Sequence, residues 1–105
     1  MRCSIIIPVL NEAEAIVSFL SHLQKFRKLG HEVIVVDGGS IDDTCELARP
    51  FVDVLLQSPS GRAKQMNTGA ETADGELLIF LHADTVLPDS AIDKVMQELE
   101  VSNKL

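Results

Sequence analysis

Residues 77–85 read LLIFLHADT, and this stretch decides the predicted fold. Its first five residues form a continuous apolar run of strand length, which predicts a strand covered on both faces, as at the centre of a parallel sheet. The run ends at His82 and Asp84. In open α/β sheets, ligands bind beyond the carboxyl ends of the strands. We therefore expect His82 and Asp84 to lie at the ligand-binding edge of such a sheet.

Three further runs are typical of strands, and helical patterns separate them. They cover residues 2–8 (RCSIIIP), 31–37 (HEVIVVD) and 52–57 (VDVLLQ). Pro8 marks the end of the first run, because proline has no amide hydrogen to donate. The alternation of strand and helix patterns predicts an α/β fold with a Rossmann-like, mostly parallel sheet and flanking helices.

Cap and turn signals set the limits of the predicted helices. Asn11 and Glu14 fit a capping box before apolar residues at helical spacing, and Gly30 suits the C′ position after them. Residues 38–40 (GGS) allow a tight turn with positive φ, and Ser40 can cap a second helix. Two more helical stripes are formed by Ala63, Met66, Ala70 and Ala73, and then, after Pro88 and Asp89, by Ile92, Val95, Met96 and Leu99.

Composition narrows the classes of function. The chain has 105 residues and a net charge of -7, and this charge opposes binding to a nucleic-acid backbone. It has no apolar stretch near the ~20 residues of a membrane helix and no cleavable leader pattern. Cys3 and Cys45 lack the spacing of a zinc site, so we expect reduced thiols in a cytoplasmic protein.

Polar residues follow three of the predicted strands. They are Asn11, Glu12, Asp37, His82 and Asp84. An oxygen ligand beside a nitrogen ligand suits Mg²⁺ or Mn²⁺. A helix cap or turn at Asp84 fits the spacing equally well, and a lone histidine such as His82 is more often a surface or hydrogen-bonding residue than a ligand.

Asp37 and the segment 61–64 (GRAK) each have a functional and an ordinary interpretation. Asp37 could bind ligand hydroxyls, or it could satisfy the amides of the turn after it. Arg62 and Lys64 lie near a predicted helix start, where backbone amides favour anions. Exposed cations are also frequent at such positions without any ligand.

Four segments together resemble a known family. Residues 4–12 (SIIIPVLNE), 35–44 (VVDGGSIDDT) and 80–85 (FLHADT) resemble the successive signatures of family 2 glycosyltransferases of the GT-A fold. Residues 61–70 (GRAKQMNTGA) are similar to the arsenosugar biosynthesis glycosyltransferase subgroup. The resemblance implies transfer of a glycosyl group from a nucleotide-diphosphate sugar to an unknown acceptor. It also implies a divalent metal, Mn²⁺ or Mg²⁺, that bridges the diphosphate.

The resemblance also implies roles for individual residues. Those in the nucleotide-sugar pocket are Pro8, Asn11, Glu12, Asp37, Arg62 and His82. Asp84 corresponds to the last acid of the DxD metal-binding motif, and Met66, Asn67 and Gly69 to the helix beneath the donor. His82 replaces the first acid of that motif, and Gly38 replaces a second acid that contacts the base in many relatives.

Family members extend well beyond 105 residues, into an acceptor half that supplies the catalytic base. We therefore expect residues 1–105 to be the nucleotide-sugar-binding half of a GT-A domain and to be inactive alone. The alternative is a non-catalytic nucleotide-binding or oligomerising α/β module, in which a homo-oligomer covers the sheet edge. A dinucleotide-binding or receiver domain is less favoured, because GxGxxG is missing after the first strand and Gln57 replaces an acid after the third.

Overall fold

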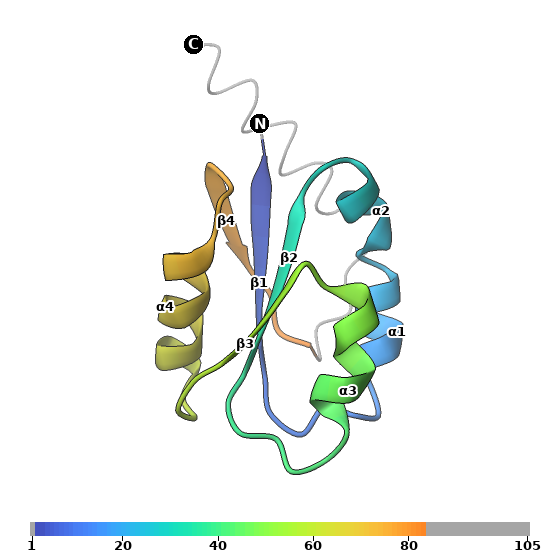
Figure 1. Ribbon diagram of the computed structural model, residues 1–105, viewed down its shortest axis with the longest axis vertical. Helices are drawn as coiled ribbons and strands as arrows, with labels where there is room; N and C mark the ends of the chain where they lie inside the picture. Colours follow the sequence, from blue (N-terminus) through green and yellow to red (C-terminus); the bar gives the residue numbers. More distant parts are fainter. Residues whose placement is uncertain (1, 84–105) are drawn as a thin grey trace.

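A parallel sheet forms the centre of the computed structural model, which describes residues 2–83 (Figure 1). The strands are β1 (Cys3–Val9), β2 (Glu32–Asp37), β3 (Val54–Gln57) and β4 (Leu77–Phe80). Their order is β3-β2-β1-β4, and all three neighbouring pairs are parallel. The predicted α/β architecture with a mostly parallel sheet is therefore confirmed for these residues.

The two central strands owe their position to their β-branched residues. β1 and β2 are buried along almost their whole length, and Ile5 pairs with Val33 and Ile7 with Val35. Such runs have no polar face to present to water, so they fit strands that are covered on both sides.

Pro8 lies within β1 and is not its last residue. The Leu81 N–H donates to the Ile6 carbonyl at 3.0 Å, so Ile6 directs its backbone groups towards β4. The backbone N–H and C=O groups of successive residues point alternately to the two sides of a strand, so those of Pro8 point to the same side as those of Ile6. On that side, β4 has already ended at Phe80. The missing amide of Pro8 consequently removes no bond between the described strands.

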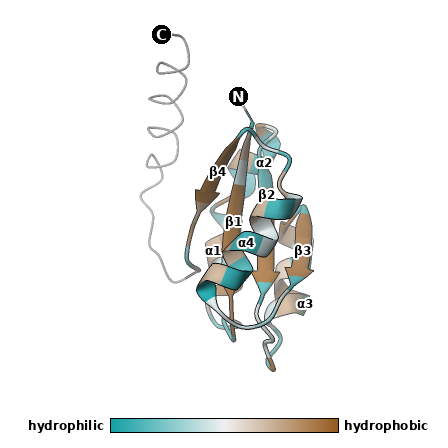
Figure 2. Ribbon diagram, turned by 90° about the vertical axis from the view of Figure 1, so that its left-hand side faces the viewer, coloured by the Kyte–Doolittle hydropathy of each residue, from teal (hydrophilic) through white to brown (hydrophobic). Residues whose placement is uncertain are grey.

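β4 differs from the prediction of a central strand covered on both faces. It lies at the edge of the described sheet, and Leu78 and Phe80 are 37% and 43% exposed. Ile79 and Leu81 pack against the core on the other face. The reason is that α4 (Arg62–Thr72) packs on β1, β2 and β3, and leaves the alternate residues of β4 uncovered. Figure 2 shows α4 in front of the central strands, with β4 to one side.

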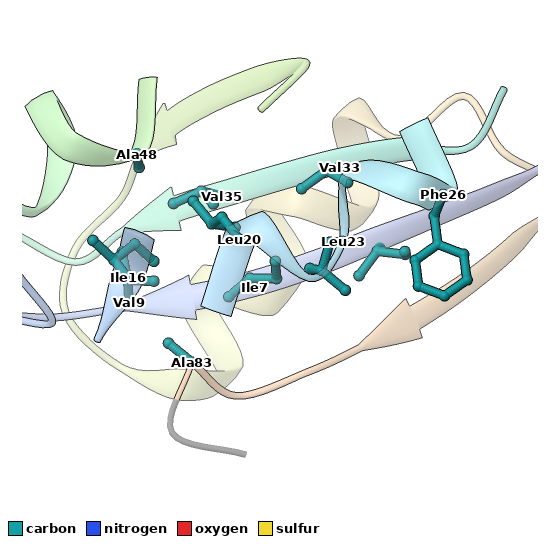
Figure 3. Close-up of a cluster of buried hydrophobic side chains, with 11 residues drawn as sticks. Ile7, Val9, Ile16, Leu20, Leu23, Phe26, Val33, Val35, Ala48 and Ala83 are labelled. Atoms are coloured by element: carbon teal, nitrogen blue, oxygen red, sulfur yellow. The ribbon is translucent and has the colours of Figure 1, made fainter. Parts of the chain in front are cut away.

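The helices lie on both faces of the sheet. α1 (Ile16–Ser21), α2 (Gln24–Lys28), α3 (Thr44–Ala48) and a 3₁₀ turn (Arg49–Phe51) cover one face, and α4 covers the other (Figure 1). The eleven-residue cluster under α1 to α3 is drawn in Figure 3. Its members are Ile5, Ile7, Val9, Ile16, Leu20, Leu23, Phe26, Val33, Val35, Ala48 and Ala83.

Two of the predicted helix starts are wrong, whereas a predicted end is confirmed. Asn11 is not an N-cap: its φ is +52°, and the first helix begins only at Ile16 and breaks before α2. Ser40 caps no helix, because its side chain bonds to Asp37 and α3 begins at Thr44. Gly30 does follow α2 with φ +95°, and the next N–H, of residue 31, donates back to the Phe26 carbonyl.

The buried face of α4 is centred on residues that the apolar pattern did not select. Gln65 and Gly69 are its buried residues, whereas Ala63 of the predicted stripe is exposed. Ala70 and Ala73 pack, as predicted, against the second cluster, which is formed by Ile6, Ile34 and Val36. A Cβ atom at Gly69 would lie only 2.5 Å from Ile6 Cγ2, so the glycine allows the helix to approach the sheet closely.

Candidate functional site

A cleft of about 240 Å³ opens at the carboxyl ends of β1 and β4, beside the start of α4. Its walls come from three parts of the chain: the end of β1, the turn into α4 and the residues after β4. The residues that line it are Pro8, Val9, Leu10, Glu12, Ser60, Gly61, Arg62, Gln65, His82 and Ala83. The structure thus brings together four predicted site residues, Pro8, Glu12, Arg62 and His82.

Asn11 does not line this cleft, and it joins two loops instead. Its Oδ1 accepts a hydrogen bond from the Ile41 N–H at 2.8 Å, and its own N–H donates to Ser40 Oγ at 2.8 Å. These bonds hold the loop after β1 against the loop after β2, with Asn11 in the left-handed region that asparagine tolerates. Asn11 therefore shapes the cleft through the backbone of its neighbours.

Glu12 is fixed in the cleft wall by the same pair of loops. Its N–H donates to Thr44 Oγ1 at 2.8 Å, and the Ala13 N–H donates to Asp42 Oδ2 at 3.2 Å. The Thr44 hydroxyl in turn donates to Asp42. Side chains from the loop after β2 thus cap the backbone amides that follow β1.

Asp37 also lies outside the cleft lining and closes the loop after β2. The side chain is only 1% exposed and accepts hydrogen bonds from the Gly39 and Ser40 N–H groups at 3.0 and 2.9 Å. Burial alone would raise the pKa of this carboxyl, but the hydrogen bonds from Ser40 and Gly39 hold the pKa below its usual value. The Asp37 carboxylate therefore satisfies the amides of the turn after it, which is one of the two roles considered for it from the sequence. A contact between Asp37 and ligand hydroxyls stays a prediction.

No disulfide joins Cys3 and Cys45, as expected from the sequence. Burial raises the pKa of the Cys45 thiol, and the nearby Asp37 carboxylate raises it further. A thiol with a raised pKa is a poor nucleophile at neutral pH.

Gln65 is a residue of the cleft lining that the sequence analysis did not select. Its side chain is 5% exposed. Nε2 donates to the Val9 and Val36 carbonyls at 2.9 Å each, and Oε1 accepts from the Gly61 N–H at 3.2 Å. In the sequence, only its position four residues before Gly69 could have indicated its burial, because this spacing places both residues on the same helical face.

The start of α4 presents positive potential to the cleft. No side chain caps this helix, whose N-cap residue Gly61 has φ +141°. The first amides of a helix have no partner within it and favour anions. Arg62 lines the cleft beside them, whereas the exposed Lys64 does not.

The predicted metal ligand Asp84 lies outside the described residues, as does the helical stripe that begins at Ile92. Glu12 and His82 offer oxygen and nitrogen donors within the cleft. Within residues 2–83, no group of three histidine, cysteine or acidic residues is placed to hold a metal ion.

The same range, residues 2–83, contains no helix of the length and apolarity needed to cross a membrane.

Comparisons with known proteins agree with this geometry. A family model described as Glycosyl transferase family 2 matches residues 4–104. The chain is 41% identical over 90 residues to the glycosyltransferase AglE of Haloferax volcanii, and the match covers 77% of this chain and 30% of AglE.

Solved structures give the same result. S. aureus TarS 1-349 in complex with UDP-GlcNAc superposes with a TM-score of 0.81 at 27% identity, covering 95% of this chain and 31% of that one. The mannosyltransferase PcManGT from Pyrobaculum calidifontis, in complex with GDP-Man and Mn²⁺, gives 0.78 at 28% identity, covering 91% and 31%. The chain spans about a third of the length of each of these proteins.

The family model covers nearly all of the sequence, and the parallel sheet with its flanking helices agrees with the superposed structures. The chain therefore belongs to glycosyltransferase family 2, and its described residues form part of the GT-A fold.

Proposed function

We propose that this chain binds a nucleotide-diphosphate sugar in the cleft between β1, β4 and the start of α4, for transfer of the glycosyl group to an acceptor. One observation carries the proposal. In a member of glycosyltransferase family 2, Pro8, Glu12, Arg62 and His82 converge on one cleft at the carboxyl ends of parallel strands. This is the edge at which open α/β sheets bind their ligands.

The diphosphate is the part of the donor that the described residues recognise most clearly. The uncapped first turn of α4 offers backbone N–H groups, and Arg62 beside it offers a planar fork of donors. Pro8 and Glu12 also line the cleft, and we place the nucleoside beside them. Asn11 and Asp37 would act by holding the two loops that shape this part of the cleft.

We assign a divalent metal, Mn²⁺ or Mg²⁺, to Asp84, with His82 in the adjoining nucleotide-sugar pocket. When bound, the metal would neutralise the charge that develops on the leaving diphosphate. The support is the donor chemistry of Glu12 and His82 in the cleft and the Mn²⁺ in the PcManGT complex. The role of Asp84 rests on its position two residues after His82.

The cleft is smaller than the ~300–1,000 Å³ of a typical ligand pocket, so it would enclose only part of a nucleotide sugar. We therefore propose residues 1–105 as the nucleotide-sugar-binding half of a GT-A domain, consistent with a match to about a third of each relative. Our assignment to the arsenosugar subgroup rests on residues 61–70 alone. Our proposal of a cytoplasmic location rests on the two unbridged cysteines.

Isothermal titration calorimetry with a nucleotide panel tests this function. UDP, GDP, ADP and CDP would each be titrated into the 105-residue protein with and without Mn²⁺. We expect one or two of these diphosphates to bind in the presence of Mn²⁺ and to raise the melting temperature. If no nucleoside diphosphate binds under either condition, the proposal is wrong.

An oligomerising module is the second candidate, and the exposed Leu78 and Phe80 on the edge strand β4 favour it. A second copy of the chain could cover this edge. Sedimentation velocity distinguishes the two candidates: a monomer that binds nucleotide supports the first, and a tight oligomer without nucleotide binding supports the second.

A further inference from the structure

We propose that Gln65 is a positioning residue that holds the diphosphate-binding turn, and that Gly38 is needed to leave space for its side chain. This inference rests on the proposed function. It assigns Gln65 to setting the backbone of Gly61 and Arg62, and not to contact with the reacting atoms.

The side-chain amide of Gln65 joins three segments of the chain. Nε2 donates to the carbonyl of Val9, at the end of β1, and to that of Val36, near the end of β2. Oε1 accepts from the Gly61 N–H, in the turn before α4. A single side chain therefore connects two strand ends with the segment that carries Arg62.

Loss of the Gln65 amide would remove one hydrogen bond from each of these segments. The bonds to the Val9 and Val36 carbonyls are buried and the bond from the Gly61 N–H is partly buried, whereas the Val9 carbonyl would keep the Gly38 N–H as a donor. A buried polar group that loses its partner costs more than the bond itself contributes. All the polar capacity of the Gln65 Nε2 group is used, so its rotamer is fixed.

Gly38 lies against the same amide group. The Gly38 N–H donates to the same Val9 carbonyl at 3.0 Å. A Cβ atom at residue 38 would lie 2.8 Å from Gln65 Oε1 and 2.9 Å from Cδ. Gly38 is not among the glycines with positive φ, so space and not backbone conformation requires glycine here. A side chain at residue 38 would therefore require the amide of Gln65 to shift from its present position.

The hydrogen bond between Gly61 and Gln65 also orders the segment that would bind the diphosphate. Gly61 has φ +141°, and its N–H is held by Gln65, so the direction of the first turn of α4 is fixed before a ligand arrives. A preorganised turn loses less conformational entropy on binding than a turn that the ligand must order. Without Gln65, Arg62 and the first amides of α4 would have to be ordered by the diphosphate itself.

A ligand series separates positioning from general stability. Gln65→Met keeps the length of the side chain and removes its amide. Calorimetry with uridine, UMP and UDP, and with the guanosine series, would be compared between this variant and wild type in Mn²⁺. We expect the affinity for the diphosphate to fall about tenfold, a change of about 1.4 kcal/mol, while the nucleoside affinity changes by less than about twofold.

Gln24→Met is the matched control. Gln24 also uses Nε2 to bind two backbone carbonyls, those of Leu20 and Phe51, but it lies on α2 outside the cleft lining. We expect it to lose stability and to keep the wild-type ratio of UDP to uridine affinity. An equal loss of affinity for all ligands in Gln65→Met, or the same split in Gln24→Met, would contradict the positioning role.

A double-mutant cycle tests the steric relationship without any ligand. Gly38→Ala should raise the unfolding equilibrium constant about tenfold when Gln65 is present, and by much less when it is combined with Gln65→Ala. Additive effects would refute the contact. If wild type binds no nucleotide, the proposed function and the positioning role both fail; if it binds and only the ligand split is missing, the inference alone fails.

Discussion

The buried carboxylate of Asp37 accepts hydrogen bonds from both the backbone N–H and the hydroxyl of Ser40, so a charge closes the loop that follows β2. This loop is bound in turn to the loop after β1, because the N–H of Asn11 donates to the Ser40 hydroxyl oxygen at 2.8 Å. Asp37 therefore supports one wall of the cleft from a distance.

Replacing Asp37 by asparagine should destabilise the protein by about 2 kcal/mol at pH 7, because hydrogen bonds to a charged group are lost and an amide donor meets N–H donors. The pKa of Asp37 in the folded protein is lowered from its unfolded value of about 3.9. Its contribution is therefore fully present above pH 4 and is lost as the pH falls through the folded pKa. Urea unfolding at pH 7 and pH 3 would show the difference between wild type and Asp37→Asn shrinking at the lower pH.

Asp43→Asn is the control for this measurement. Asp43 is exposed, lies in the same loop and makes no capping hydrogen bond with its side chain. We expect a change within about 0.5 kcal/mol, as is usual for surface substitutions. An equal loss of stability in both variants would show that the loop responds to net charge and not to the bonds of Asp37.

Gly69→Ala should lower stability although alanine favours helices. The gain in helix propensity is at most about 1 kcal/mol, whereas the added Cβ would lie 2.5 Å from Ile6 Cγ2 and force α4 away from the sheet, which costs about 1–3 kcal/mol. Thermal unfolding would show a lower melting temperature. Asn67→Ala, on the exposed side of the same helix, should leave the melting temperature unchanged or raise it. A stabilised Gly69→Ala variant would mean that α4 approaches the sheet less closely.

Arg62→Ala should weaken binding of a nucleoside diphosphate about tenfold, because one charge-assisted contact beside the helix start is lost. Lys64→Ala removes the same charge two residues further on, outside the cleft lining, and should change the affinity by less than about twofold. Calorimetry on both variants gives the comparison. Equal losses would indicate a general effect of charge and no directed contact by Arg62.

Asp84→Asn should remove the dependence of nucleotide binding on Mn²⁺ and keep the weaker metal-independent binding, because a neutral amide is a poor ligand for a hard cation. Asp89→Asn tests whether any acid in this segment has the same effect. Titration of Mn²⁺ at constant UDP or GDP provides the measurement. An unchanged response to Mn²⁺ in Asp84→Asn would assign the metal to other residues.

The sheet could be predicted because its signals are local. The β-branched runs around Ile6 and Val35 have no polar face, and this property alone requires cover on both sides. The run at β4 is equally apolar, although Ile79 is its only β-branched residue, yet Leu78 and Phe80 are exposed. Burial of that strand depends on which elements lie beside it, and apolar composition does not contain this information.

The cleft was predictable from topology, whereas its supports were not. Residues at strand ends, such as Glu12 and His82, gather at one edge in any parallel sheet. Gln65 is held by hydrogen bonds to the carbonyls of Val9 and Val36, which are distant from it in the sequence. A local sequence pattern therefore does not predict them. The capping-box pattern at Asn11 failed for a similar reason, because the Ile41 amide from another loop competes for its side chain.

The most direct test of the account is to locate Mn²⁺ on the protein by paramagnetic broadening of backbone amide signals in the NMR spectrum. The tightest-binding nucleoside diphosphate would be present at saturation, with Mg²⁺ as the diamagnetic reference. The account predicts broadening of the amides of Gly61, Arg62, His82 and Ala83, which line the cleft, and sharp signals for Gly30 and Asp74 at the opposite end of the sheet. Broadening centred on Gly30 or Asp74, or no broadening at the cleft, would contradict it.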